Sequence, residues 1–260
     1  MRRHVQIHLC TGIINTTQTS GDLDKKPVSQ EQLWLALLFP AFTMLALGID
    51  SVYFLKTYFD GRYLTNVLAI GYFLLIYFSS ASHLRKLMFV MVFLSYLGEL
   101  IFCSWLGMYT YRTSHIPIYV PFGHAIVYAS GYIVAKTSLA THMDNKLRIF
   151  FAVAFITLFL YVGIMLGDVF TLIFGVFFFL LLYRKRWDNM YYFIALCVII
   201  IELIGTYFKC WAWAPKIFGY IPGSNPPMGA VFFYGGGDVL LAKIVAIWEK
   251  KNSQKVPTRV

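Results

Sequence analysis

The stretch Glu99-Leu100-Ile101 places a carboxylate inside a run of apolar residues, and Glu202-Leu203-Ile204 does the same in the second half of the chain. Each glutamate is followed by an aromatic cluster, a loop, a Pro-x-Gly step and a tyrosine seven residues after that proline. The first copy contains Trp105, Tyr109, Tyr111, Pro121-Phe122-Gly123 and Tyr128, and the second contains Tyr207, Trp211, Trp213, Pro227-Met228-Gly229 and Tyr234. Because a carboxylate is costly to leave in lipid, this echo predicts a polar site inside a membrane protein.

The composition is that of an integral membrane protein. Hydrophobic residues make up 59% of the 260 residues and charged residues 13%, with a mean hydropathy of +0.66. Soluble domains carry about 25% charged residues. Apolar runs of roughly twenty residues recur along the chain, which predicts an all-α, polytopic bundle of about eight transmembrane helices. We expect the spans at 33–56, 63–80, 87–107, 121–137, 149–166, 169–183, 191–209 and 228–248. Spans five and six, joined by Gly167-Asp168, are alternatively one kinked or re-entrant unit.

The net charge of +10 is explained by topology rather than by nucleic-acid binding. With eight spans, 16 Lys and Arg residues fall on one side of the membrane and 5 on the other, with Lys243 near the inner end of the last span. The positive-inside rule then predicts that both termini are cytoplasmic, in a plasma or inner membrane. Residues 1–32 would form a polar cytoplasmic tail, and residues 249–260 a basic one.

The echo also predicts an internal repeat. Two four-helix halves, 33–140 and 149–248, would be related by a rotation about the membrane normal, with Glu99 near Glu202. Four spans separate the copies, so both would point the same way, as in a parallel repeat. The alternative is coincidence between two apolar sequences of low complexity.

The acidic residues within the spans are the candidate catalytic groups. Glu99, Glu202 and Asp238 are expected to line one pocket that opens to the non-cytoplasmic side, roofed by the loops 112–121 and 210–227. Intramembrane acids usually face the protein interior and mark function. Asp238 follows Gly235-Gly236-Gly237, which would let a ligand or another backbone come close. A structural acid at a tight helix contact is the alternative for Asp238.

Further residues are expected to contribute to binding. They are His124, Asp50, Tyr111, Trp211, Trp213 and Asn225. His124 is either a proton carrier or a hydrogen-bonded structural residue. The aromatic residues are alternatively part of the belt that Trp and Tyr form at membrane interfaces, although Trp211 and Trp213, two residues apart, do not share one lipid-facing stripe. No metal or cofactor is expected, because the histidines are not clustered at ligand spacing and no phosphate-binding glycine loop is present.

Three functions remain open at this stage. The first is an enzyme that uses acid–base chemistry on a lipidic or isoprenoid substrate, with aromatic rings that stabilise a developing cation. The second is a proton- or cation-coupled transporter of small molecules. The third is a non-catalytic membrane accessory protein. In general plan, carboxylates facing aromatic rings in a small helical membrane protein resemble the integral-membrane terpene cyclases, although no motif of that family is matched residue by residue. The expected partners are membrane lipids or a lipidic small molecule.

Overall fold

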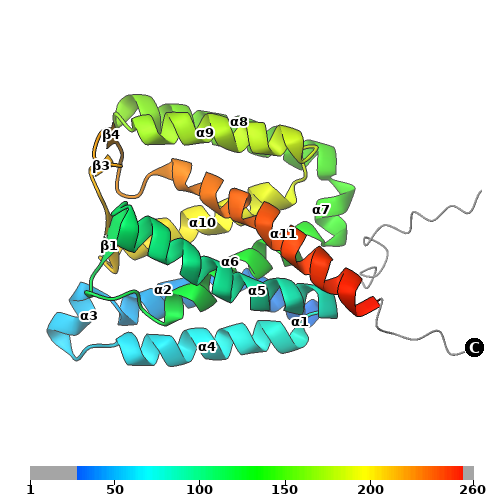
Figure 1. Ribbon diagram of the computed structural model, residues 1–260, viewed down its shortest axis with the longest axis horizontal. Coiled ribbons are helices and arrows are strands. Elements are labelled where there is room, and N and C mark those ends of the chain that lie inside the picture. The colour runs from blue at the N-terminus through cyan, green and yellow to red at the C-terminus, as the bar shows by residue number, and fades with distance from the viewer. Residues whose placement is uncertain (1–27, 254–260) are drawn as a thin grey trace, which may run out of the picture.

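The computed structural model describes residues 28–253, and this part of the chain is mostly helical. The polar tail predicted for 1–32 and the basic tail predicted for 249–260 lie largely outside the described residues. The start of α1 and the end of α11 lie at the same end of an elongated bundle (Figure 1).

The helices occupy every range in which the sequence predicts a span. The first half contains α1 (Gln30–Leu37), α2 (Phe39–Ile49), α3 (Val52–Thr57), α4 (Arg62–Ser79), α5 (Ser82–Glu99), the π-helical turn η2 (Leu100–Trp105), β1 (Tyr109–Tyr111) and α6 (Tyr119–Ala135). The second half contains α7 (Ser138–His142), α8 (Asp144–Met165), α9 (Val169–Arg184), α10 (Met190–Tyr207), β2 (Trp211–Trp213), β3 (Lys216–Ile217), β4 (Ile221–Pro222), the short 3₁₀ turn η3 (Met228–Ala230) and α11 (Val231–Ser253).

Five helices in the described part of the chain are long and apolar enough to cross a membrane. The pair α1 and α2 adds a sixth if it is counted as one span, although the two helices are bent by 44°. Pro40 at the start of α2 explains the bend, because proline lacks the N–H that would continue the helical ladder. Helices α6 and α9, with 17 and 16 residues, are short for a span. The helical membrane architecture is therefore supported, and the count of eight spans is not confirmed.

Helices α8 and α9 are two separate elements and not one kinked unit. Gly167 takes a positive φ of 68° between them, a conformation that glycine adopts without steric cost. Asp168 then caps α9 by accepting a hydrogen bond from the backbone N–H of Thr171 at 2.7 Å. The two helices consequently fold back on each other and lie side by side (Figure 1).

Helix α6 lies inside the bundle and packs against α10, α5, α4 and α1. Gly131 allows the closest of these approaches, because a Cβ added there would lie 2.7 Å from the Cα atom of Ile194 on α10. Large apolar side chains on the outer helices are exposed instead, among them Val67, Ile149 and Ile164. An apolar exterior of this kind fits a lipid environment.

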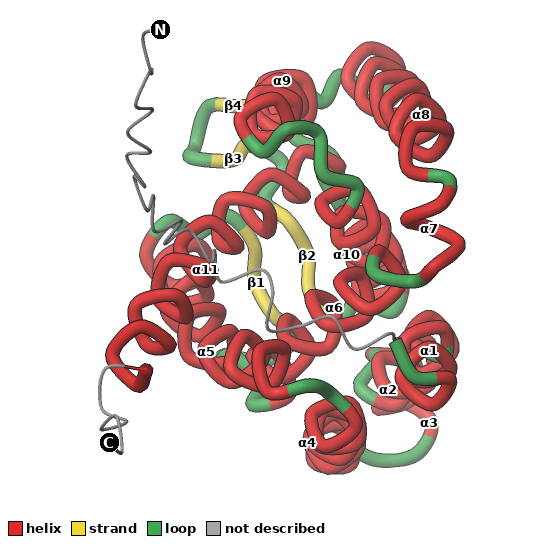
Figure 2. The backbone as a smooth tube through the Cα atoms, turned by 90° about the vertical axis from the view of Figure 1, so that its right-hand side faces the viewer, coloured by secondary structure: helices red, strands yellow, loops and turns green. Residues whose placement is uncertain are grey.

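Four short strands gather at one end of the bundle, which we call the strand end (Figure 1). Strands β1 and β2 pair antiparallel, with Tyr109 opposite Trp213, Thr110 opposite Ala212 and Tyr111 opposite Trp211. Strands β3 and β4 form a second, separate pair. Seen along the bundle, β1 and β2 lie across its middle, with α5 and α11 on one side and α6 and α10 on the other (Figure 2). The strand pair therefore closes the strand end over the helices that carry the glutamates.

Candidate functional site

Glu99 is buried at the end of α5, where the helix passes into the π-helical turn η2. Its Oε2 atom accepts hydrogen bonds from the hydroxyl groups of Tyr109 at 2.9 Å and Tyr111 at 2.7 Å. Its Oε1 atom lies 3.0 Å from Nε2 of His124 on α6. Both carboxylate oxygens of Glu99 are therefore engaged by protein groups.

Tyr109 and Tyr111 reach Glu99 together because alternate residues of a strand face the same side. Burial, and then the nearby charge of Glu99, raise the pKa of both phenols well above their usual range. The two phenols stay protonated and act as donors.

Glu202 has a closely similar environment on α10. Its Oε2 atom accepts hydrogen bonds from the indole nitrogens of Trp211 and Trp213, each at 2.9 Å. Gly205 makes this arrangement possible, because a Cβ at that position would lie 2.0 Å from the ring of Trp211. In contrast to Glu99, the Oε1 atom of Glu202 has no hydrogen-bond partner among the described residues.

The strand pair presents all four donors on one face. Tyr109 lies opposite Trp213 and Tyr111 opposite Trp211, so each pair projects from the same side of the sheet. Their rings are in contact, with centroids 4.8 Å apart for Tyr109 and Trp213 and 6.2 Å apart for Tyr111 and Trp211. One small sheet therefore supplies two hydrogen bonds to each of two buried glutamates.

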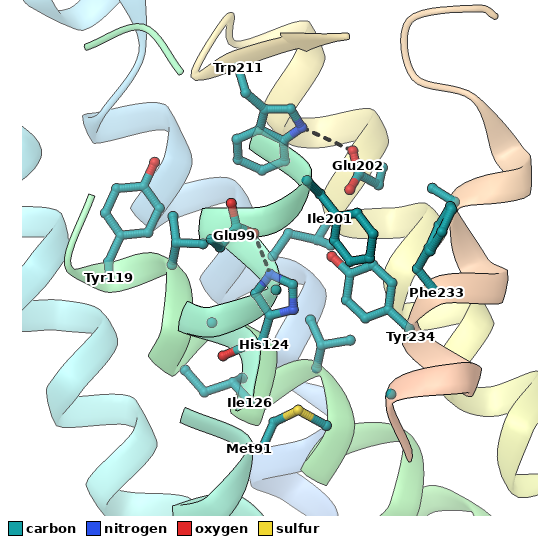
Figure 3. A pocket seen from close by; sticks show the side chains of 18 of the residues that line it. Met91, Glu99, Tyr119, His124, Ile126, Ile201, Glu202, Trp211, Phe233 and Tyr234 are labelled. Atoms are coloured by element: carbon teal, nitrogen blue, oxygen red, sulfur yellow. Dashed lines mark hydrogen bonds and ion pairs between the residues drawn. The ribbon is translucent and has the colours of Figure 1, made fainter. Parts of the chain in front are cut away.

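Glu99 and Glu202 line the same cavity, which has a volume of about 390 Å³ (Figure 3). Its walls are mostly aliphatic and aromatic side chains, with His124 and Tyr234 beside the glutamates. The ring of Tyr234 stacks on His124, with centroids 4.9 Å apart and planes 9° from parallel. The Tyr234 hydroxyl, which has no hydrogen-bond partner among the described residues, points toward the part of the cavity between Glu99 and Glu202.

The cavity is confined to the strand end of the bundle. In each long helix, the residues that line it belong to the half nearest the strands. They lie between residues 65 and 69 on α4, 91 and 99 on α5, 119 and 127 on α6, 201 and 202 on α10, and 232 and 240 on α11, although not every residue within these ranges lines the cavity. The site is therefore one-sided.

Asp238 stands apart from the two glutamates. Its Oδ1 atom accepts a hydrogen bond from Tyr128 at 2.9 Å and its Oδ2 atom one from Tyr191 at 2.6 Å. Asp238 does not line the cavity. Because Tyr128 belongs to α6 and Tyr191 to α10, Asp238 ties α11 to both helices, which corresponds to the structural alternative for this residue.

Asp50 also lies outside the cavity lining and belongs to a buried ion cluster at the strand end. Its carboxylate accepts hydrogen bonds from Arg112 at 2.6 Å and from the hydroxyl of Tyr119 at 2.7 Å. Arg112 also bonds Asp60 at 2.8 Å, and this hydrogen bond lowers the pKa of Asp60. The backbone N–H of Arg112 donates to Cys210 at 2.8 Å, so the cluster anchors the end of the strand pair.

Asn225 supports the strands from the other side. Its Oδ1 atom accepts a hydrogen bond from the backbone N–H of Trp213 at 2.9 Å. Asn225 does not line the main cavity. Of the residues expected to bind a ligand, Tyr111, His124, Trp211 and Trp213 therefore meet at the cavity, whereas Asp50 and Asn225 hold its roof in place.

Sequence reasoning did not single out Tyr234 or Arg112 as functional. Tyr234 was visible as the tyrosine that ends the second copy of the echo, and Arg112 as a cation next to the tyrosine pair. Among residues 28–253, no group of three or more His, Cys, Asp or Glu side chains is arranged to hold a metal ion. The chain matches no protein-family model, no curated protein and no solved structure, so its function has to be inferred from the chemistry of this cavity.

Proposed function

We propose that the protein is an integral membrane enzyme that uses acid–base chemistry on a lipidic or isoprenoid substrate. The observation that carries this proposal is that two buried carboxyl groups, those of Glu99 and Glu202, line one largely apolar cavity. Such groups are costly in a membrane protein unless they are paired or used. One carboxylate oxygen of Glu202 has no hydrogen-bond partner among the described residues, which favours a role in contacting a substrate.

The two glutamates are suited to different tasks. Glu202, with an unbonded Oε1 atom in the cavity, is positioned to give a proton to a substrate or to take one from it. Glu99, whose oxygens are held by two phenols and His124, is positioned to stabilise positive charge on the reacting atoms. The aromatic rings of the walls add to this stabilisation, because their faces attract cations.

The alternatives receive less support from the geometry. A transporter needs access to its site from both sides of the membrane, whereas the lining of this cavity is confined to the strand end. A purely structural role does not explain why Glu202, a residue of the cavity wall, keeps one carboxylate oxygen without a hydrogen-bond partner among the described residues. The one-sided cavity therefore favours the enzyme over the transporter, and the unbonded oxygen of Glu202 favours it over the accessory protein.

The topology and the repeat enter the same proposal. We infer eight crossings with the strand end outward, supported by the helices in all eight ranges and by the basic residues Arg85, Lys86, Arg184, Lys185, Lys250 and Lys251 at the opposite ends of their helices. A cysteine introduced at His115 should react with an impermeant maleimide on intact cells, and reaction only after permeabilisation would reverse the orientation.

The proposed internal repeat is supported by the equivalent partners of Glu99 and Glu202. It is also supported by the antiparallel pairing of the strands about Thr110 and Ala212, which a two-fold axis would produce.

The test of the enzyme proposal is a comparison of lipid extracts. The gene would be deleted in the cells that carry it naturally and restored as wild type, as Glu202→Gln, or as the control Glu249→Gln at the far end of α11. We expect one lipid to accumulate on deletion and to disappear with wild type and Glu249→Gln, but not with Glu202→Gln. If Glu202→Gln restores the wild-type lipid profile at equal protein levels, the proposed chemistry is wrong.

A further inference from the structure

Helices α5 and α11 lie side by side along one flank of the bundle and touch near both ends of their contact (Figure 1). Near the strand end, the rings of Phe102 and Phe233 are 4.9 Å apart. Toward the opposite end, the ring centroids of Phe89 and Trp248 are 6.3 Å apart, and Lys86 forms an ion pair with Glu249 at 2.8 Å. These two contacts frame the stretch of the interface that lies between them.

That middle stretch of the interface contains several glycines. A Cβ added at Gly236 or Gly237 would meet no heavy atom within 4 Å, and one at Gly98 on α5 would meet only Phe102 of the adjoining turn η2. Gly235 differs, because its added Cβ would lie 2.7 Å from Leu181 on α9. The glycine triplet therefore has two roles: Gly235 lets α9 approach, while Gly236 and Gly237 leave open space beside the helix.

The open space is continuous with the cavity. Gly98, Gly236 and Gly237 all line the cavity that contains Glu99 and Glu202. Two further lining residues lie on the outer surface, Leu97 at 54% exposure and Leu240 at 48%. Because these exposed residues are leucines on helices long enough to span a bilayer, the cavity reaches the surface of the bundle where hydrocarbon surrounds it.

A separate observation indicates that something enters this space. Glu202 is buried, with 6% exposure, and lines the cavity, yet its Oε1 atom has no hydrogen-bond partner among the described residues. The Tyr234 hydroxyl is likewise unpartnered among the described residues. Unbonded polar groups at the inner end and leucines at the outer end match a ligand with one polar end and a long apolar tail.

We propose that the cavity opens sideways into the bilayer between α5 and α11, and that a single hydrocarbon chain enters there from a membrane lipid. The polar end of the lipid meets Glu202 and Tyr234, and its tail passes Gly98 and Gly237 to the surrounding lipid. This inference rests on the proposed function in taking the ligand to be lipidic, and it adds the route of access and the shape of the substrate.

Asp238 explains how the opening is maintained. It follows Gly237 directly, and its bonds to Tyr128 and Tyr191 set the rotation of α11 about its own axis. With Asp238 turned toward α6 and α10, Gly237 falls on the face of α11 that carries Phe233 and Trp248, whose rings contact Phe102 and Phe89. Asp238 is thus a positioning residue for the opening rather than a catalytic one.

The test uses Gly237→Phe in full-length protein in phosphatidylcholine nanodiscs. The probe is hexadecanol that carries a diazirine and an alkyne, and the readout is photo-cross-linking to Met91 and Ile126, two buried residues of the cavity wall. We expect labelling of both residues in wild type and a decrease of about tenfold in Gly237→Phe, because the phenyl ring takes the space of the chain. The matched control is Gly71→Phe on the exposed face of α4, where an added Cβ also meets nothing within 4 Å, and labelling should not change.

The outcomes separate this inference from the proposed function. Equal labelling of Met91 and Ile126 in wild type and Gly237→Phe would overturn the sideways opening while leaving a lipidic occupant in place. Absence of labelling at both residues in wild type would overturn the lipidic occupant as well. If Gly237→Phe elutes as aggregate, Gly236→Leu provides the same obstruction with a smaller side chain and is judged by the same readout.

Discussion

Glu99 and Glu202 face one cavity, yet they differ in how completely the protein bonds them. Glu99 has donors on both oxygens, two phenols on one and His124 on the other. Glu202 has two indole donors, both on the same oxygen. Two similar arrangements of strand and glutamate therefore hold one carboxylate with donors on both oxygens and one with donors on a single oxygen. This difference is what singles out Glu202 as the reactive group in the proposed function.

The difference can be traced to single positions when the two similar stretches of sequence are aligned at Glu99 and Glu202. Where the first copy has His124, the second has Ala230, whose methyl group offers Glu202 no hydrogen bond. Where the first copy has Tyr128, which bonds Asp238, the second has Tyr234, which stacks on His124. These two positions therefore account for the different surroundings of the two glutamates.

The largest expected effect comes from removing the charge of each glutamate in turn. Glu202→Gln should lower turnover of the accumulated lipid by about 10² to 10⁴, the usual contribution of general acid–base catalysis. Its melting temperature should change little, because the amide oxygen still accepts the two indole N–H bonds. Glu99→Gln should lower turnover less. Initial rates and melting curves of both variants check this, and equal or reversed losses of rate would contradict the assignment of roles.

The next largest effect should come from the anchor of the strand pair, on which both glutamates depend. Arg112→Leu leaves Asp50 buried without its cation and should cost about 3–5 kcal/mol of stability. The matched control is Arg62→Leu, whose partner Asp60 is more exposed, with an expected cost of about 0–1 kcal/mol.

Unfolding of the detergent-solubilised protein with SDS would measure both variants. A similar loss of stability in both would show that the buried position of Asp50 does not matter. Arg112→Leu should also reduce probe labelling of the cavity, because the strands that roof it lose their attachment.

A smaller effect should follow from removing one hydrogen-bond donor to Glu99 or one to Glu202. Tyr109→Phe leaves Glu99 with Tyr111 and His124, whereas Trp213→Phe leaves Glu202 with Trp211 alone. A hydrogen bond to a charged group contributes about 1.5–3 kcal/mol, so both variants should melt at a lower temperature. Trp213→Phe should show the larger decrease. If Tyr109→Phe is the more damaging change, the two glutamates differ in a way that donor number does not explain.

Much of the site was visible in the sequence because it depends on local chemistry. Acids in apolar helices and the repeated aromatic clusters indicated Glu99, Glu202 and the residues around them. Trp211 and Trp213 illustrate what local chemistry leaves open. Their spacing indicated only that they do not share one lipid-facing stripe of a helix, whereas the strand pairing turns both indole N–H groups toward Glu202.

Asp238 shows the same limit from the other direction. In the sequence, Asp238 resembled the two glutamates because it is also an acid within an apolar helix. Its hydrogen-bond partners Tyr128 and Tyr191 are 110 and 47 residues away along the chain. Only the packing of α11 against α6 and α10 decides that those tyrosines satisfy it. The number of membrane spans is also left open by the sequence, because α6 and α9 are short helices whose depth in the membrane depends on their neighbours.

The sequence by itself determined that this protein is a helical membrane protein with glutamates buried among aromatic residues, because hydropathy and the cost of a charge in lipid act residue by residue. The tertiary structure alone decided that β1 pairs with β2, that Glu99 and Glu202 share one cavity while Asp238 does not, and that Gly236 and Gly237 leave a gap beside α5. Hydrogen bonds and open space between distant segments exist only after the helices have packed, so no pattern along the chain specifies them.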